Sequence, residues 1–154
     1  MVYLFTILLQ NRKFLYTVLR KMPREALFEI PDGFRNHIYW NIAHVLVTQQ
    51  LITYGLSNLP LQVDADLVAK YRKGTFPQTD AVSEEEIEKL QELLFTTLEQ
   101  TEQDYQEGRF KEYQPYTTSA NVTLTSVEDA LAFNVYHEGL HLGAILALQK
   151  AIRS

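Results

Sequence analysis

The chain of 154 residues contains no cysteine, and this absence removes several classes of chemistry at once. A disulfide framework, a thiolate nucleophile, a Cys-ligated zinc site and an iron–sulfur cluster all require cysteine. Any metal site in the protein must therefore use histidine, aspartate or glutamate. Histidine itself is scarce, since the whole chain has four.

Basic charge is limited as well, because 14 lysines and arginines stand against 19 aspartates and glutamates, for a formal net charge of −5. This balance provides no broad electrostatic surface for nucleic acid or for an anionic membrane. The small basic cluster of Lys70, Arg72 and Lys73 is typical of a solvated turn. We therefore expect no nucleic-acid partner and no membrane partner.

Long apolar runs are also missing. The apolar stretch at residues 2–9 is far too short to span a bilayer, and it lacks the basic segment and the small-residue cleavage site of an export signal. These features predict a cytoplasmic protein. The chain length predicts one domain, residues 1–154, with a core large enough to fold by itself.

Four segments show the apolar spacing of helices. They are residues 3–22, 36–54, 83–108 and 125–152. Pro23 ends the first segment, Gly55 is a candidate C-terminal cap of the second, and Ser83 with Glu86 has the spacing of a capping box in the third. The second and fourth segments are the most apolar, which favours their meeting in the protein interior.

The connection between the second and third segments, residues 56–82, is long and contains a candidate short helix at 64–70. Its length suits a crossover along the bundle better than a tight turn. The Val/Thr-rich stretch at 121–125 is too short to imply a sheet. The predicted fold is therefore all-α, a four-helix bundle with a long crossover connection between helices 2 and 3.

His137 and His141 are four residues apart in the fourth segment. On a helix this spacing separates the side chains by about 40° in direction and about 6 Å along the axis, so both rings can reach one ion. Imidazole is the most common biological metal ligand. From spacing alone, the alternative is a pair of buried, hydrogen-bonded histidines.

The same segment, with Glu138 after His137, matches the H-E-x-x-H pattern of zinc metalloproteases. Those enzymes need a further ligand downstream, and the extended pattern H-x-x-G-x-x-H fails at Ala144 and Ala147. No downstream ligand exists in this chain. The short motif is also common by chance, so we do not favour a metalloprotease.

A third ligand is available in the second segment, where His44 stands among apolar residues. A neutral histidine buried there needs either a hydrogen-bond partner or a metal, because an unpaired polar group is costly in the interior. Ligands that face each other across the core of a helical bundle are an established way to build a metal site.

The segment Trp40-Asn41-Ile42-Ala43-His44, followed by His137 and His141 on the last helix, resembles the DinB/YfiT-like superfamily of four-helix-bundle metalloproteins. The resemblance covers essentially the whole chain, including the long second connection. It implies a three-histidine metal site at His44, His137 and His141, usually holding zinc, nickel or iron.

The resemblance further implies a protein that is often a homodimer. Relatives include thiol-dependent transferases and isomerases that use bacillithiol, mycothiol or glutathione, whereas most members have no assigned reaction. A low-molecular-weight thiol is therefore the cosubstrate that the resemblance suggests.

Two further side chains are candidates for a fourth ligand. His37 lies on nearly the same face as His44 but about 10 Å away along the axis, so we interpret it as pocket lining or a satisfied interior histidine. Glu138 is expected near the rim of the site, either as a surface or interhelical carboxylate or as a candidate general base.

Asn41 and Asn134 each precede a proposed ligand by three residues, His44 and His137 respectively. At that spacing an amide can orient the imidazole or bind a substrate, and ordinary hydrogen bonding between helices is the alternative. Trp40 is interpreted as a core aromatic beside the site. Hydroxyl groups of the loop at 113–119 could cover an open metal position.

Gly139, Gly143 and Ala147 form a stripe of small residues in the fourth segment. Because glycine costs about 1 kcal/mol against alanine inside a helix, the stripe predicts close approach of another helix, either of a second subunit or, as we favour, of the same bundle.

Three hypotheses follow for function. The first is a metal-dependent transferase that acts on a small-molecule substrate and uses a thiol cosubstrate. The second is a non-catalytic, metal-stabilised helical module for binding or regulation. The third is a helical domain whose histidines only form hydrogen bonds.

Overall fold

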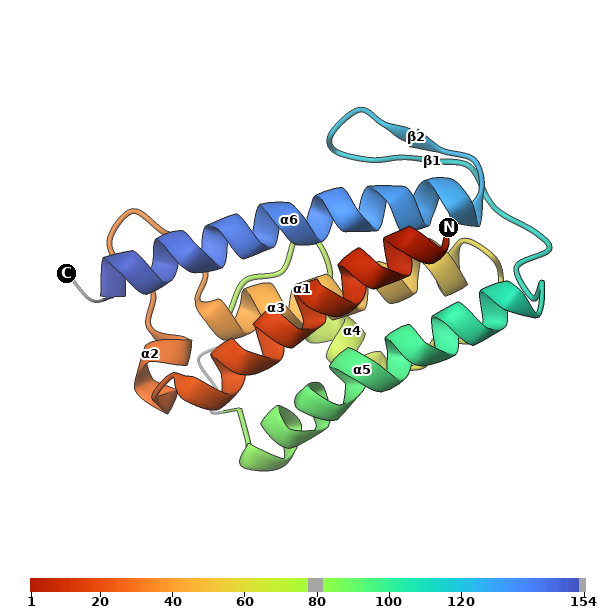
Figure 1. Cartoon of the computed structure of the whole chain (residues 1–154). Coiled ribbons are helices and arrows are strands. Elements are labelled where there is room, and N and C mark those ends of the chain that lie inside the picture. The colour runs from red at the N-terminus through yellow and green to blue at the C-terminus, as the bar shows by residue number, and fades with distance from the viewer. Residues whose placement is uncertain (78–81, 153–154) are drawn as a thin grey trace.

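The computed structural model describes residues 1–77 and 82–152, and its long helices form the predicted all-α bundle. Those helices are α1 (Val2–Lys21), α3 (Ile38–Gln50), α5 (Glu84–Gln106) and α6 (Val127–Ile152). Figure 1 shows α1 and α6 running in one direction and α3 and α5 in the other. Among the described residues, no helix has the length and hydropathy needed to cross a bilayer.

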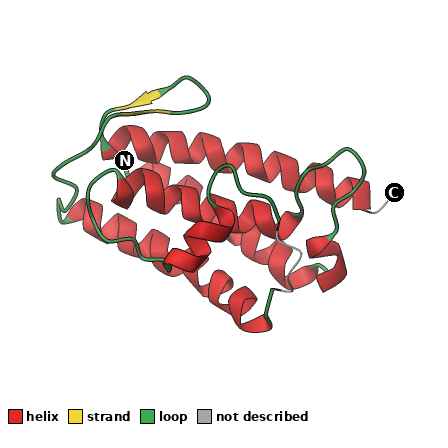
Figure 2. Ribbon diagram, turned by 180° about the vertical axis from the view of Figure 1, so that it is seen from behind, coloured by secondary structure: helices red, strands yellow, loops and turns green. Residues whose placement is uncertain are grey.

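The direction of the helices explains the long connection. Because α3 and α5 are parallel, the chain must return along the bundle before α5 can begin. The returning segment contains the short helix α4 (Ala65–Tyr71), which packs on α3 on the side away from α1 (Figure 2). The predicted crossover and its short helix are thus both confirmed.

Helix α3 is the central element of the fold. All of its residues are buried except Thr48, as expected for a helix that is apolar around most of its circumference. It packs chiefly against α6, with α2 and α4 covering other parts of its surface. The two histidine-bearing helices therefore meet in the interior, as predicted from their apolar composition.

Three local features differ from the sequence prediction. A short helix, α2 (Arg24–Phe28), follows Pro23, and the second predicted helix ends in a π-helical turn, η1 (Leu51–Gly55). A small antiparallel hairpin of β1 (Tyr116–Thr117) and β2 (Thr123–Leu124) lies over the first turns of α6 (Figure 1). Two-residue strands carry too little periodic signal to be predicted from sequence.

The prediction of close packing at the small-residue stripe is wrong for the single chain. A Cβ atom placed at Gly139 or at Gly143 would meet nothing within 4 Å, and both glycines are exposed on α6. The neighbouring side chains of Tyr136, Leu140 and Leu146 are about half exposed. This face of α6 is turned away from the bundle.

Candidate metal centre

The three predicted ligands come together where α3 packs against α6. One ring nitrogen from each of His44, His137 and His141 lies within 4.8 Å of those of the other two. Their ring centroids are 5.2 Å apart for His44 and His137, 4.9 Å for His44 and His141, and 4.6 Å for His137 and His141. His44 is buried and the two α6 histidines are half-buried.

The hydrogen bonds of His44 assign its protonated nitrogen. Its Nδ1 lies 2.7 Å from the backbone carbonyl of Tyr71, at the end of α4. A carbonyl oxygen only accepts, so Nδ1 carries the hydrogen and Nε2 keeps its lone pair. Among the described residues, the Thr48 hydroxyl contacts that Nε2 at 3.3 Å, a long contact that leaves the lone pair available.

His141 is held in the same way by an amide. Its Nδ1 lies 2.8 Å from Asn41 Oδ1, while Asn41 Nδ2 donates to the carbonyl of His37 and to Asn36 Oδ1. Because the amide nitrogen is occupied by two acceptors, the oxygen faces His141 and accepts its Nδ1 hydrogen. Of the alternatives for Asn41, the structure shows it holding an imidazole, but that imidazole is the candidate ligand His141 and not His44.

His137 has a different environment. Within the described part of the chain, its buried Nδ1 has no hydrogen-bond partner. Its ring is nearly parallel to that of Phe133, with the two centroids 6.2 Å apart. A buried ring nitrogen without a partner is unfavourable unless a ligand or an ordered water satisfies it.

All three histidines are kept neutral by their surroundings. Burial lowers the pKa of His44, and it lowers that of His141 to about 4 with a smaller contribution from the charge of His44. Burial, followed by the charges of His141 and His44, lowers the pKa of His137 to about 3. Neutral imidazole is the form that binds a metal, so no proton has to leave at neutral pH.

The donor set fits a divalent transition metal. Three neutral imidazoles suit zinc, nickel, copper or iron. Two of them, His44 and His141, donate the N–H of Nδ1 to an oxygen, as the non-coordinating nitrogen of a metal-bound histidine usually does. Because the three nitrogens lie within 4.8 Å of one another, small side-chain movements are enough to bring them onto one ion.

Trp40 and His37 support the site without joining it. The Trp40 ring stacks on His44, with centroids 4.6 Å apart and planes at 9°, and its Nε1 donates to Thr75 Oγ1. His37 is the N-cap of α3, where its Nδ1 accepts a hydrogen bond from the Trp40 backbone N–H. Our interpretation of His37 as a satisfied interior histidine is confirmed, and it does not line the pocket described below.

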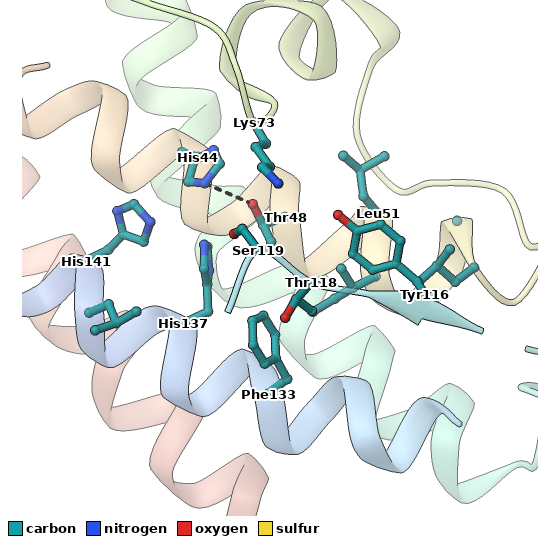
Figure 3. A pocket seen from close by; sticks show the side chains of 14 residues that line it. His44, Thr48, Leu51, Lys73, Tyr116, Thr118, Ser119, Phe133, His137 and His141 are labelled. Atoms are coloured by element: carbon teal, nitrogen blue, oxygen red, sulfur yellow. Dashed lines mark hydrogen bonds between the residues drawn. The ribbon is translucent and has the colours of Figure 1, made fainter. Parts of the chain in front are cut away.

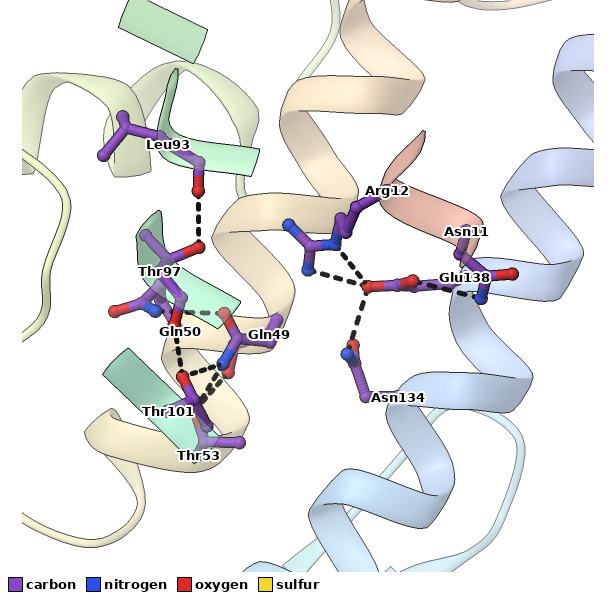
Figure 4. A network of polar contacts seen from close by, with 10 residues as sticks. All are labelled: Asn11, Arg12, Gln49, Gln50, Thr53, Leu93, Thr97, Thr101, Asn134 and Glu138. Atoms are coloured by element: carbon purple, nitrogen blue, oxygen red, sulfur yellow. Dashed lines mark hydrogen bonds and ion pairs between the residues drawn. The ribbon is translucent and has the colours of Figure 1, made fainter. Parts of the chain in front are cut away.

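The prediction that Glu138 lies at the rim is wrong. Glu138 is fully buried, and its Oε1 accepts a hydrogen bond from Arg12 Nε of α1 at 2.9 Å and forms an ion pair with Nη2 at 2.7 Å (Figure 4). Its other oxygen accepts from Asn11, and Asn134 donates to Oε1 instead of orienting His137. These contacts engage both carboxylate oxygens and argue against a role as general base.

A pocket of about 640 Å³ adjoins the three histidines (Figure 3). Its apolar wall comes from η1 and α6 and includes Leu51, Ile52 and Phe133. Hydroxyl groups of Thr48 and of the hairpin region line it as well, as expected for the loop that begins at residue 113. The hairpin residues in the lining are Tyr116, Thr118 and Ser119.

Several residues of the site were not predicted from sequence. The Tyr71 carbonyl could not be found by pattern, because every residue has one and the fold selects which is used. Lys73 lines the pocket although its basic cluster is typical of a solvated turn, and its neighbour Lys70 forms ion pairs with Asp66 and Glu86.

A comparison with protein-family models places the chain in a known group. The model described as the DinB superfamily matches residues 7–145, which include His44, His137 and His141. A search of curated proteins found no significant match. Because the match covers most of the chain and agrees with the helical fold, the protein belongs to the DinB superfamily.

Proposed function

We propose that the protein is a metal-dependent enzyme that holds zinc, nickel or iron at His44, His137 and His141 and transfers a group between a thiol cosubstrate and a small-molecule substrate. The observation that carries this proposal is the pocket of about 640 Å³ that opens directly onto the three histidines. Pockets of this volume accommodate ligands of the size of a typical metabolite or drug.

A metal bound by three neutral nitrogens keeps a coordination position for a ligand and lowers the pKa of a bound thiol or water. The chain has no cysteine, so any reacting sulfur must come with the cosubstrate. The protein side chains contribute orientation and the exclusion of water. The Trp40 ring, the Asn41 amide and the Tyr71 carbonyl orient two of the imidazoles.

The second hypothesis, a metal-stabilised module without catalysis, would be favoured by a closed ligand set or by a site without an adjacent pocket. The pocket that adjoins the three histidines counts against the second of these conditions. His37 and Glu138, the two candidates for a fourth ligand, are engaged elsewhere, in a helix cap and in a buried ion pair. This arrangement supports the enzyme over the module.

The proposal is tested with metal-loaded protein by screening glutathione, cysteine, bacillithiol and mycothiol against an electrophile such as 1-chloro-2,4-dinitrobenzene. We expect metal-dependent turnover with at least one thiol, lost in His137→Ala and kept in His37→Asn, because asparagine preserves the helix cap. Full metal occupancy without turnover for any thiol and acceptor would favour the non-catalytic module.

A further inference from the structure

The pocket beside the histidines has an uneven distribution of charge. Lys73 is the only lysine or arginine among the described residues that line it, and that lining includes no aspartate or glutamate. The histidines are neutral at pH 7 because burial lowers their pKa values. A chain with a net charge of −5 therefore presents a pocket whose formal charge is positive.

Lys73 is an exposed side chain whose charge no residue in the described part of the chain neutralises. Lys70, three residues earlier, pairs with Asp66 at 2.9 Å and with Glu86 at 3.1 Å. In the described part of the chain, the Lys73 ammonium makes no hydrogen bond or ion pair, and Figure 3 shows it directed into the pocket on the side of Thr48 and Ser119. Its charge is thus available to a ligand.

Much of the remaining lining is apolar. Leu51, Ile52 and Leu56 come from η1 and the residue after it, while Phe133 and Leu140 come from α6. A ligand that fills this space is stabilised by burial of its apolar surface. A ligand that also reaches Lys73 needs an acidic group at one end.

We propose that the pocket binds an amphipathic organic anion, whose apolar body packs against Phe133 and η1 and whose single carboxylate or sulfonate pairs with Lys73. The role of this ligand as a substrate rests on the proposed function, whereas its binding does not. Charge complementarity favours this class over a neutral molecule of the same shape, because an acidic group gains an attraction to the exposed ammonium that a neutral ligand cannot gain.

Two fluorescent probes with the same ring systems test the proposal. 8-Anilinonaphthalene-1-sulfonate carries a sulfonate, and N-phenyl-1-naphthylamine is its uncharged counterpart. Dissociation constants are measured for both probes with metal-loaded protein and with protein stripped by EDTA. Lys73→Met should weaken sulfonate binding about three- to tenfold and leave binding of the neutral probe within about twofold.

Two further variants give the experiment its controls. Arg72→Met removes a neighbouring exposed cation that does not line the pocket, and it should change neither dissociation constant. Ser119→Trp places a large ring at an exposed position of the pocket lining, so it should weaken the binding of both probes if they occupy the pocket.

Equal effects of Lys73→Met and Arg72→Met on sulfonate binding would overturn the proposal, as would unchanged binding of both probes in Ser119→Trp. Sulfonate binding that depends on the metal and not on Lys73 would also overturn it, since the metal would then be the partner of the anion. Metal content measured on the same samples separates this result from failure of the proposed function. A chain without bound metal contradicts that function even where Lys73 selects the anion.

Discussion

At the scale of single residues, the three imidazoles of the centre differ in the hydrogen-bond partner of their Nδ1 atom. The Tyr71 carbonyl and the Asn41 amide oxygen accept from His44 and His141, which leaves Nε2 of both rings as the free base. His137 lacks such an acceptor in the described structure. The three ligands are therefore not equivalent.

Asn41 provides the first prediction. Asn41→Leu removes the acceptor that orients His141, and we expect metal affinity to fall about 10- to 100-fold, the usual cost of losing such a partner. Asn41→Asp keeps the acceptor for His141 but sets its second oxygen against the His37 carbonyl and Asn36 Oδ1, so it should retain more affinity than Asn41→Leu and less than the wild type. Competition with a chromophoric chelator measures both, and equal affinities for the leucine variant and the wild type would contradict the assignment.

Glu138 provides the second prediction. Glu138→Gln leaves the fully buried Arg12 guanidinium without its counter-ion, and we expect the free energy of unfolding to fall by about 3–5 kcal/mol. Glu92→Gln, at an exposed position of α5, serves as the matched control with little change expected. Urea denaturation measures both.

The double variant Arg12→Met/Glu138→Leu removes both charges and should recover much of the stability lost by Glu138→Gln. If Glu138→Gln retains wild-type stability and loses only activity, the carboxylate has a catalytic role and our account of the ion pair is wrong.

The sequence predicts the metal-facing histidines better than the residues around them. Helical spacing brings His137 and His141 to one face, and apolar composition brings His44 to meet them. Spacing along one helix cannot tell which neighbouring helix a side chain meets. For this reason Asn41 reaches across to His141, and Asn134 turns to Glu138.

At the scale of elements, α4 links the crossover to the centre. Its last residue, Tyr71, accepts from His44 through the backbone, and its hydroxyl donates to Glu86 in the first turn of α5. Ser83 is confirmed as the N-cap of α5, because its hydroxyl oxygen accepts a hydrogen bond from the Glu86 backbone N–H. The Glu86 side chain does not complete a capping box, since its carboxylate accepts from the hydroxyls of Tyr39 and Tyr71 instead. The sequence predicts that α4 exists and cannot predict this docking.

The exposed face of α6 provides the third prediction. Because Gly139 and Gly143 have open space around them, alanine at either position should raise the free energy of unfolding by about 0.5–1 kcal/mol through helix propensity alone. Thermal or urea denaturation measures the gain. A loss of stability on either substitution would mean that another surface packs on this face, as it would in the homodimer suggested by family resemblance.

At the scale of the whole molecule, the buried histidines couple folding to pH. The folded pKa is about 4 for His37, about 3 for His137 and about 4 for His141, against 6.5 for an unperturbed histidine. Below pH 6.5 the unfolded chain therefore binds protons that the folded chain does not. Stability from these groups is fully present above pH 6.5 and is lost as pH falls toward 4.

The fourth prediction follows from that coupling. In EDTA, the free energy of unfolding should fall by about 5–6 kcal/mol between pH 7 and pH 5, because each of the three histidines contributes about 2 kcal/mol. His137→Gln should lower the number of protons taken up on unfolding by about one, since glutamine does not titrate. Urea denaturation across the pH range measures the slope, and a flat profile above pH 5 would contradict the low histidine pKa values.

The central claim concerns the molecule as a metal protein, and metal analysis of tag-free protein tests it most directly. After growth in metal-replete medium, we predict about one transition-metal ion per chain in the wild type and in His37→Asn. His44→Ala, His137→Ala and His141→Ala should each lose the ion while keeping the helical fold by circular dichroism. A clearly substoichiometric wild type, or full metal content in any of the three alanine variants, would contradict the assigned centre.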